Sequence, residues 1–383
     1  MLKMILQIIS GVLLLFIISV IVFIKVAPQF GASSKDARLE RILNSPNFND
    51  GKFQNLVPTP MSGENTSMWK NGLKFLKKGG EREPNKVIET NKFDKEAFLK
   101  KDAGIAVAWF GHSSLILNIN GTIILTDPVF SETASPVSFM GVKRFNYTNQ
   151  FEVEDMPEID VVLISHDHYD HLDYHTILKL KNKARKFYVP LGVAAHLIHW
   201  GIEEEKIVEL DWWDKNELSD SLQFIATPSR HFSGRKGVDK DYTLWCSWVI
   251  KSNNSSVYYC GDSGYGDHFK QIGDKYGPFD LTLMECGQYN EGWPYIHMMP
   301  EQSVQAHVDL KGKTMIPIHW GKFNLSLHKW TEPIERAKKH AEVLSVELLS
   351  PIPGQIIEIG TNQDKEILLN NQQEELNSVL VGK

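Results

Sequence analysis

The most informative segment of the sequence is Ser165-His166-Asp167-His168-Tyr169-Asp170-His171-Leu172-Asp173, at the end of an apolar run at 160–165. Neutral imidazole nitrogens and carboxylate oxygens are the ligands that Zn²⁺, Fe and Mn²⁺ sites use. Because alternate residues of an extended chain point to one side, His166 and His168 are expected to face the same way. Asp170 and His171 then lie close enough to reach a second ion. A solvated polar loop is the other interpretation, but so many ligand types at one strand end favour a metal site.

Further ligands are expected downstream, because four groups cannot complete two metal sites. His231 follows a strand-like run at 222–227, Asp262 follows one at 257–260, and His319 follows one at 315–318. Each alone could be structural. Together with the upstream string they become candidate ligands, since strand ends can converge at one edge of a sheet.

Between about 104 and 351 the chain alternates short apolar runs with turns and helix-like segments. Asn120-Gly121 is a hairpin turn signal. Strands are predicted at 105–110, 114–119, 122–126, 160–165, 187–190, 222–227, 243–250, 257–260, 281–284 and 315–318. Helices are predicted at 174–181, 193–200, 302–309 and 332–342. Strands and helices mix without strict alternation, which favours two sheets covered by helices.

A faint internal duplication accompanies this pattern. Trp109 to Asp127 runs through strand, turn and strand to an aspartate, and Trp245 to Asp262 does the same. If the duplication is genuine, both aspartates lie at strand ends on the same edge; chance similarity is the alternative.

The first 26 residues differ from everything that follows. From Met4 to Ile24 the chain is apolar apart from Gln7, Ser10, Gly11 and Ser19. At ~1.5 Å per residue this run is long enough to cross ~30 Å of hydrocarbon. A retained membrane anchor is favoured over a cleaved signal peptide or a buried core helix. The basic residues after the run favour a cytoplasmic location for the remainder, and a chain beginning near Gly31 is expected to be soluble and active.

Two further segments flank the patterned region. The polar stretch 27–103 holds a short helix candidate at 34–43 and is either an arm that packs on the main domain or a spacer. The tail after Gly360 is rich in Asn, Gln and Glu and is expected to be peripheral.

Composition excludes several classes of protein. The chain has 383 residues, of which 42% are hydrophobic and 23% charged, which excludes wholesale disorder. A net charge of -6 argues against nucleic-acid binding by bulk charge. Cys246, Cys260 and Cys286 are too few for a disulfide framework.

The metal string together with His231, Asp262 and His319 resembles the metallo-β-lactamase superfamily, which implies a four-layer αββα sandwich of the α/β (α+β) class. Within it, the chain is similar to the N-acyl phosphatidylethanolamine phospholipase D branch over about 104–345. The shared phrases are Trp-Phe-Gly-His-Ser (109–113), Thr-Asp-Pro-Val-Phe-Ser (126–131), Met-Gly-Val-Lys-Arg-Phe (140–145), Glu-Leu-Asp-Trp-Trp (209–213), Gly-Asp-Ser-Gly-Tyr (261–265), Gly-Pro-Phe-Asp-Leu (277–281) and Ile-His-Trp-Gly (318–321). The expected organisation is an anchor at 1–26, an arm or linker at 27–103, a hydrolase domain at 104–350 and a tail at 351–383.

The resemblance implies roles for individual residues. One metal would be held by His166, His168 and His231, and the other by Asp170, His171 and His319. Asp262 would bridge the two ions, most simply two Zn²⁺ with Fe or Mn as alternatives. His297 would lie near the substrate, as a catalytic group beside Asp170 or as a packing residue. His112 and Asp127 are expected to support the site. The loop 286–290, which would help to shape the substrate pocket, departs from the branch.

The resemblance also implies a reaction. A hydroxide shared by two metals and oriented by Asp170 would attack the phosphodiester of an N-acyl phosphatidylethanolamine or a related phospholipid. The same centre could instead hydrolyse a lactone, thioester or amide. A membrane-tethered binding protein without activity is the more remote alternative, since the ligand set is intact. Membrane and phospholipid, or another small ester, are the expected partners, and nucleic acid is not.

Overall fold

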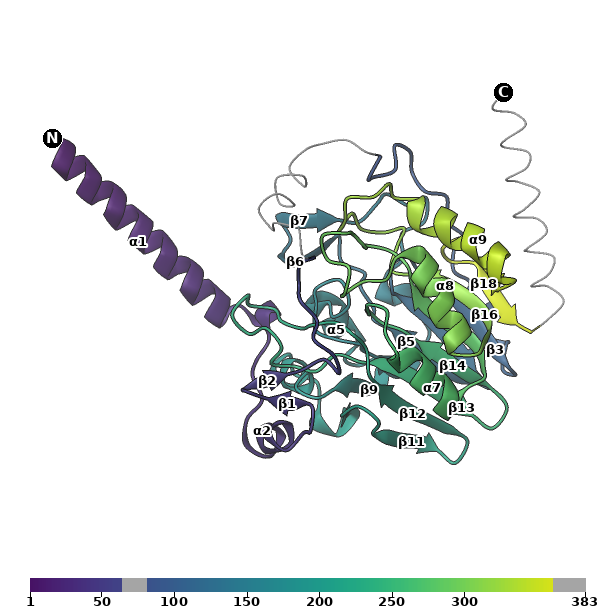
Figure 1. Ribbon diagram of the computed structural model, residues 1–383. Helices are drawn as coiled ribbons and strands as arrows, with labels where there is room; N and C mark the ends of the chain where they lie inside the picture. Colours follow the sequence, from purple (N-terminus) through teal and green to yellow (C-terminus); the bar gives the residue numbers. More distant parts are fainter. Residues whose placement is uncertain (64–80, 361–383) are drawn as a thin grey trace, which may run out of the picture.

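The computed structural model describes residues 1–63 and 81–360, so the predicted peripheral tail after Gly360 lies outside the described residues. Two large sheets of seven strands each form its centre (Figure 1). In the first sheet the strand order is β10-β9-β8-β5-β4-β3-β18. These strands are β3 (Ile105–Trp109), β4 (Leu115–Ile119), β5 (Thr122–Thr126), β8 (Ile159–Leu163), β9 (Ala184–Pro190), β10 (Ile207–Leu210) and β18 (Ile356–Ile359).

The second sheet has the order β11-β12-β13-β14-β15-β16-β17. Its strands are β11 (Lys215–Ser219), β12 (Leu222–Thr227), β13 (Ser247–Ser252), β14 (Ser256–Tyr259), β15 (Phe279–Glu285), β16 (Gly312–Ile318) and β17 (Glu347–Leu348). The buried runs read from the sequence therefore become central strands, and their apolar character follows from burial on both faces.

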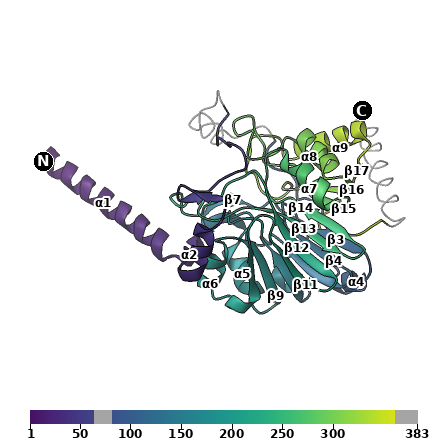
Figure 2. The same cartoon turned by 60° about the horizontal axis from the view of Figure 1, so that its bottom comes forward.

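Three apolar layers separate four layers of secondary structure. Between the sheets, Val107, Leu117 and Val161 pack with Phe224 and Trp248. The outer face of the first sheet is covered by α5 (Tyr174–Leu180) and α6 (Ala194–His199). The outer face of the second is covered by α7 (His268–Tyr276), α8 (Pro300–Asp309) and α9 (Glu332–Leu344), which gather on one side in Figures 1 and 2. This confirms the predicted αββα sandwich.

The two sheets repeat one pattern of strand pairing. Read from β18, the first sheet has three antiparallel pairs followed by three parallel pairs. Read from β11, the second sheet has the same succession. In this correspondence β5 matches β14, and these are the strands that precede Asp127 and Asp262. The faint duplication seen in the sequence is therefore matched by the topology.

The boundary drawn at residue 350 is wrong. Residues 356–359, assigned to the tail, form β18 and pair antiparallel with β3 from Ile356↔Ala108 to Ile359↔Ile105. The pattern analysis also missed β10, β11 and the small hairpin of β6 (Thr133–Val137) and β7 (Met140–Lys143). These are short or partly exposed strands, so they lack a continuous apolar run.

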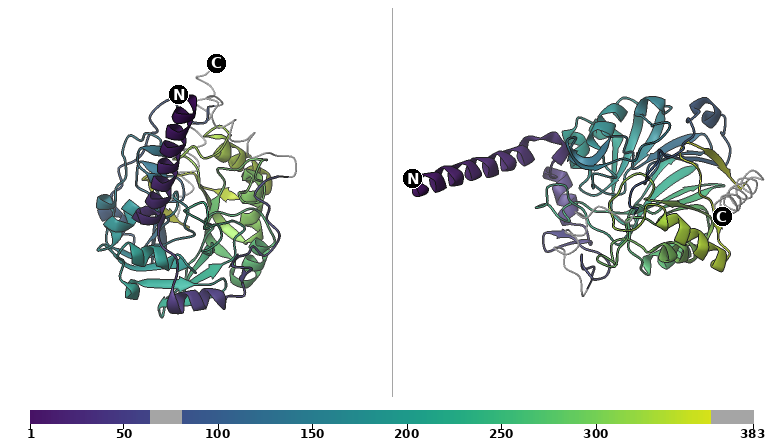
Figure 3. Two further views of the ribbon diagram at one scale, coloured as in Figure 1. Left: turned by 90° about the vertical axis from the view of Figure 1, so that its left-hand side faces the viewer. Right: turned by 90° about the horizontal axis from the view of Figure 1, so that it is seen from above.

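Helix α1 (Leu2–Val26) stands apart from the sandwich, as the right view of Figure 3 shows. It is long and apolar enough to cross a membrane, and none of its residues is buried. This arrangement contradicts the alternative of a buried core helix, because such a helix would be covered by the protein.

The described parts of 27–103 pack on the sandwich, as the arm interpretation expects. This arm contains α2 (Asp36–Leu43), a hairpin of β1 (Phe48–Asn49) and β2 (Lys52–Phe53), and α4 (Lys95–Leu99). Arg38 forms an ion pair of 2.9 Å with the buried Glu209. The Ser45 hydroxyl donates to Asp211 at 2.6 Å, and the Phe53 amide donates to the Asp241 carbonyl.

The turn that follows α1 is docked beside the metal-binding string. Arg235 is buried, and its Nε and one terminal nitrogen donate to the Gln29 carbonyl at 3.1 and 2.9 Å. Its other terminal nitrogen donates to the carbonyls of Asp167 and Leu172. The Trp200 indole donates to the Pro28 carbonyl at 2.7 Å. One guanidinium thus joins the residues after α1 to the loop that carries the histidines.

Because of this docking, we expect a truncated chain to keep its full stability when it begins at Ala27, but not when it begins at Gly31. A variant lacking 1–30 loses the carbonyls that accept from Arg235 and Trp200, and each buried donor left without a partner costs about 1–3 kcal/mol. We expect its thermal midpoint to fall several degrees below that of a variant lacking 1–26, because ~1 kcal/mol shifts the midpoint of a domain of this size by a few degrees. Differential scanning calorimetry of the two metal-loaded variants measures this, and equal midpoints would contradict it.

Candidate metal centre

Seven candidate ligands meet at one edge of the sandwich, each in a loop that follows a strand. The string 166–171 follows β8, His231 follows β12, Asp262 follows β14 and His319 follows β16. The loops approach closely: Gly261 has a φ of +59°, and a Cβ there would lie 2.6 Å from the Ser165 Cβ. Glycine at 261 therefore lets the Asp262 loop of one sheet touch the string of the other.

The first group comprises His166, His168, His231 and Asp262. The His168 Nδ1 lies 2.8 Å from the His166 Nε2 and 3.3 Å from the His231 Nε2. One oxygen of Asp262 lies 3.8 and 3.6 Å from the His166 and His231 nitrogens. Three imidazole nitrogens and a carboxylate thus face one point.

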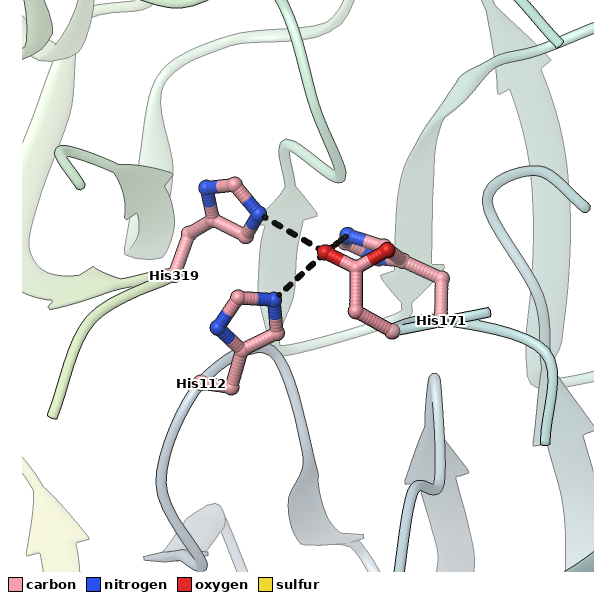
Figure 4. Close-up of side chains that lie close together, drawn as sticks. His112, His171 and His319 are labelled. Atoms are coloured by element: carbon pink, nitrogen blue, oxygen red, sulfur yellow. Dashed lines mark hydrogen bonds and ion pairs between the residues drawn. The ribbon is translucent and has the colours of Figure 1, made fainter. Parts of the chain in front are cut away.

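The second group comprises Asp170, His171, His319 and His112. Figure 4 shows the three labelled imidazoles directed at one carboxylate oxygen, the Asp170 Oδ2. This oxygen lies 2.9 Å from the His112 Nε2, 3.5 Å from the His171 Nε2 and 3.6 Å from the His319 Nε2. His112, expected only to support the site, is thus in direct contact with a candidate ligand.

Asp262 lies between the two groups. Its Oδ1 is 3.2 Å from both the His171 Nε2 and the His319 Nε2. Its Oδ2 faces the first group, at the distances given above. One carboxylate therefore presents one oxygen to each group, which is the arrangement of a bridging ligand.

Several of the buried atoms that meet here make no hydrogen bond within the part of the chain that the structure describes. His171 Nε2, His319 Nε2 and Asp262 Oδ1 are buried, and none has a hydrogen-bond partner among the described residues. Buried polar atoms are ordinarily satisfied, so a set that converges without partners indicates an absent ligand. Imidazole nitrogens with carboxylate oxygens are the donor set of Zn²⁺ and of first-row transition metals. The residues present fit two divalent cations.

In the first group, the surroundings favour neutral histidines and an ionised aspartate. Burial, reinforced by neighbouring histidines, lowers the pKa of His166 well below its usual value. Burial likewise lowers the pKa of His231. Burial alone would raise the pKa of Asp262, but His171 and His319 hold it well below the usual range. Neutral imidazoles beside an ionised carboxylate are what a divalent cation binds.

Backbone strain is concentrated at this edge. His112, Asp127 and His319 have φ values of +55°, +32° and +66°, in the left-handed region that non-glycine residues rarely adopt. Such conformations cost on the order of 1–3 kcal/mol each and persist where the surroundings impose them. The three strained residues follow β3, β5 and β16. Their unusual backbone conformation directs their side chains towards the site.

Asp127 orients His171 from behind, as a supporting role predicts. Its Oδ2 lies 2.7 Å from the His171 Nδ1 and also accepts from the Ser165 and Tyr259 hydroxyls at 2.5 Å. Its Oδ1 accepts from the Ser165 amide. With Nδ1 bound to Asp127, the His171 Nε2 is directed at the two groups, so the carboxylate sets the tautomer and the direction of the ligand.

Glu285 is a functional candidate that the sequence analysis missed. It is fully buried at the end of β15, with Oε2 3.3 Å from the His297 Nδ1 and 3.4 Å from the His319 Nδ1. Its Oε1 accepts from the Met298 amide at 2.8 Å. In the sequence, Glu285 is a carboxylate at the end of an apolar run, and the same pattern identifies Asp262 as a candidate ligand.

The arm contributes to the site as well. The side chain of Asn55 accepts from the His231 amide at 3.0 Å and donates to the His231 carbonyl at 2.8 Å. The His231 Nδ1 lies 2.9 Å from the Ile296 carbonyl, which directs its Nε2 at the first group. Asn55 gave no signal in the sequence, because it lies 176 residues before its partner in a polar segment.

A pocket of about 370 Å³ opens over the two groups. Its apolar walls are Met61, Phe232, Trp293, Ile296 and Leu325. His297 lines it too, with its Nδ1 turned towards Glu285. Gln288, from the segment that departs from the branch, also lines the pocket and is held by hydrogen bonds to Phe323 and Leu325.

Replacing Asp127 with Asn tests the orientation of His171. An amide can offer its NH₂ group to the His171 Nδ1, which removes the acceptor that directs Nε2. We expect metal affinity to fall by about 10–100-fold, measured by competition with a chelator. Asp280→Asn is the matched control, since Asp280 accepts from the Ser256 amide near the opposite end of β15. Equal affinities in both variants and the parent would refute the role of Asp127.

Comparison with known proteins agrees with this geometry. The family model described as beta-lactamase superfamily domain matches residues 122–320. An uncharacterized protein of Mycobacterium tuberculosis is 41% identical over 321 residues, covering 82% of this chain and 84% of its own. N-acyl-phosphatidylethanolamine-hydrolyzing phospholipase D 1 of Caenorhabditis elegans is 32% identical over 251 residues, covering 62% and 70%. The structure of isothiocyanate hydrolase from Delia radicum gut bacteria aligns with a TM-score of 0.53 at 19% identity, covering 67% and 100%. The chain therefore belongs to the metallo-β-lactamase superfamily.

Proposed function

We propose that the protein is a dinuclear metal-dependent phosphodiesterase of phospholipase D type, acting on N-acyl phosphatidylethanolamine or a related phospholipid. The fold of the superfamily implies divalent metal binding. Two metal ions are proposed because the Asp262 carboxylate presents one oxygen to each of the two ligand groups. We propose Zn²⁺ for both ions, held by His166, His168 and His231 on one side and by Asp170, His171 and His319 on the other.

The substrate class is supported by the pocket and by the relatives. A relative at 32% identity is described as hydrolysing N-acyl phosphatidylethanolamine. The pocket beside the candidate ligands has apolar walls, which suit an acyl chain. Helix α1 would hold the enzyme at a lipid surface as a membrane anchor, and the basic residues after it favour the cytoplasmic side.

Asp170, His112, His297 and Glu285 would each have a separate role in the hydrolysis. When bound, two divalent cations supply a water of lowered pKa and positive charge for the phosphoryl oxygens. Asp170 positions the attacking water while it holds one ion, and His112 fixes the Asp170 carboxylate. His297 faces the bound substrate, with Glu285 holding its Nδ1, so its other ring nitrogen is the one available to the leaving group or the phosphate.

The two ligand sets predict separable losses of metal. Elemental analysis of the parent should give about two ions per chain. His166→Ala should lose mainly the ion of the first group, and His319→Ala mainly that of the second, because the two histidines belong to different groups. His340→Ala, on α9, is the control. Two ions and full turnover in both site variants would show the assignment to be wrong.

The reaction type is tested with Asp170→Asn and labelled water. We expect at least a ~100-fold loss of kcat, about 2.7 kcal/mol of barrier, because a neutral amide binds metal weakly and removes the carboxylate that orients the water. Hydrolysis of N-acyl phosphatidylethanolamine vesicles in ¹⁸O-water should place the label on phosphatidic acid. Label in the alcohol product would contradict attack at phosphorus. Turnover of lactones or thioesters without any diester turnover would favour the alternative ester and amide chemistry.

A further inference from the structure

The β6–β7 hairpin exposes an apolar tip. Val137 pairs with Met140, which leaves Ser138 and Phe139 to form the turn. Phe139 is 85% exposed and Met140 is 65% exposed. Turns that face water ordinarily use Gly, Asn, Asp, Ser or Pro. A phenylalanine and a methionine at such a tip indicate that something apolar covers them.

Charge is absent from the tip and confined to the base of the hairpin. Residues 134–142 carry no ionisable side chain. Glu132 and Lys143, which bracket this segment, form an ion pair of 2.8 Å with each other. The tip could therefore enter an apolar medium without burying a charge, while the charged pair stays at its edge.

The hairpin lies beside the end of α1. Gln29 lines a pocket of about 110 Å³ together with the hairpin residues Ser135, Pro136 and Ser138. Gln29 is three residues beyond the last residue of α1, a separation of at most about 11 Å along the chain. Figures 1 and 2 agree, since β7 lies on the side of the domain from which α1 departs.

The point at which α1 leaves the domain is held in place. The Arg235 and Trp200 side chains bind the Gln29 and Pro28 carbonyls, and the Phe23 ring of α1 packs edge-on against Phe30 at 5.6 Å. The 25 residues of α1 extend about 37 Å, which exceeds a hydrocarbon core of ~30 Å. If α1 crosses the bilayer, its end lies in the headgroup layer, with the hairpin beside it.

We propose that Phe139 and Met140 insert into the same bilayer that α1 crosses and give the catalytic domain a second membrane contact. This inference rests on the membrane anchor of the proposed function, and it is independent of the substrate. One helix alone would let the domain tilt relative to the bilayer. A second contact at the hairpin restricts that tilt, so the domain presents one constant face to the lipid.

Depth-dependent quenching in the full chain tests the insertion. Phe139→Cys is labelled with an environment-sensitive fluorophore in vesicles of phosphatidylcholine and phosphatidylglycerol, with or without brominated acyl chains. The native thiols of Cys246, Cys260 and Cys286 are buried, so an added exposed cysteine is the one that reacts. Leu14→Cys, in α1, is the inserted reference. Val343→Cys, 71% exposed on α9, is the matched water-exposed control.

We expect the fluorophore at position 139 to show blue-shifted emission and to lose intensity with brominated lipid, as the fluorophore at position 14 does. The fluorophore at position 343 should show neither change. Quenching at 14 without quenching at 139 would overturn the second contact while leaving the anchor intact. No quenching at either position would overturn the anchor and the hairpin contact together. A blue shift at 139 without quenching would show that protein, not lipid, covers the tip, which also overturns the proposal. Circular dichroism and bound metal verify that each variant is folded.

Discussion

The Asp262 carboxylate is buried between two groups of imidazoles, and one of its oxygens faces each group. Its Oδ1 and the Nε2 atoms of His171 and His319 have no hydrogen-bond partner among the described residues. An unsatisfied buried polar group costs about 1–3 kcal/mol. Such a set is tolerated where a cation compensates for it, so metal binding and the stability of this edge are coupled.

The architecture of the sandwich brings these groups together. Each sheet has the same succession of antiparallel and parallel pairs, and the corresponding strands β5 and β14 lead to Asp127 and Asp262. The two carboxylates have diverged in role: Asp262 faces both groups, whereas Asp127 holds His171 from behind. A pseudo-repeated fold thus supplies a candidate ligand from one half and its support from the other.

Much of the fold and of the site could be predicted from the sequence, for local reasons. The string 166–171 concentrates ligand types in a few residues, and His231, Asp262 and His319 each follow an apolar strand. Glu285 was missed because one carboxylate at a strand end is weak evidence by itself. Asn55 and the docking of Gln29 depend on contacts with backbone groups far away in the sequence, and such contacts leave no pattern. β18 was missed because it is short and lies more than 240 residues along the chain from β3, the strand with which it pairs.

Anomalous diffraction from crystals of the metal-loaded protein tests whether two divalent ions flank Asp262. We predict two peaks ~3.5–4 Å apart, one within bonding distance of His166, His168 and His231, and the other within bonding distance of Asp170, His171 and His319. A single peak, or a peak coordinated by Glu285 and His297 in place of one of these groups, would contradict this prediction.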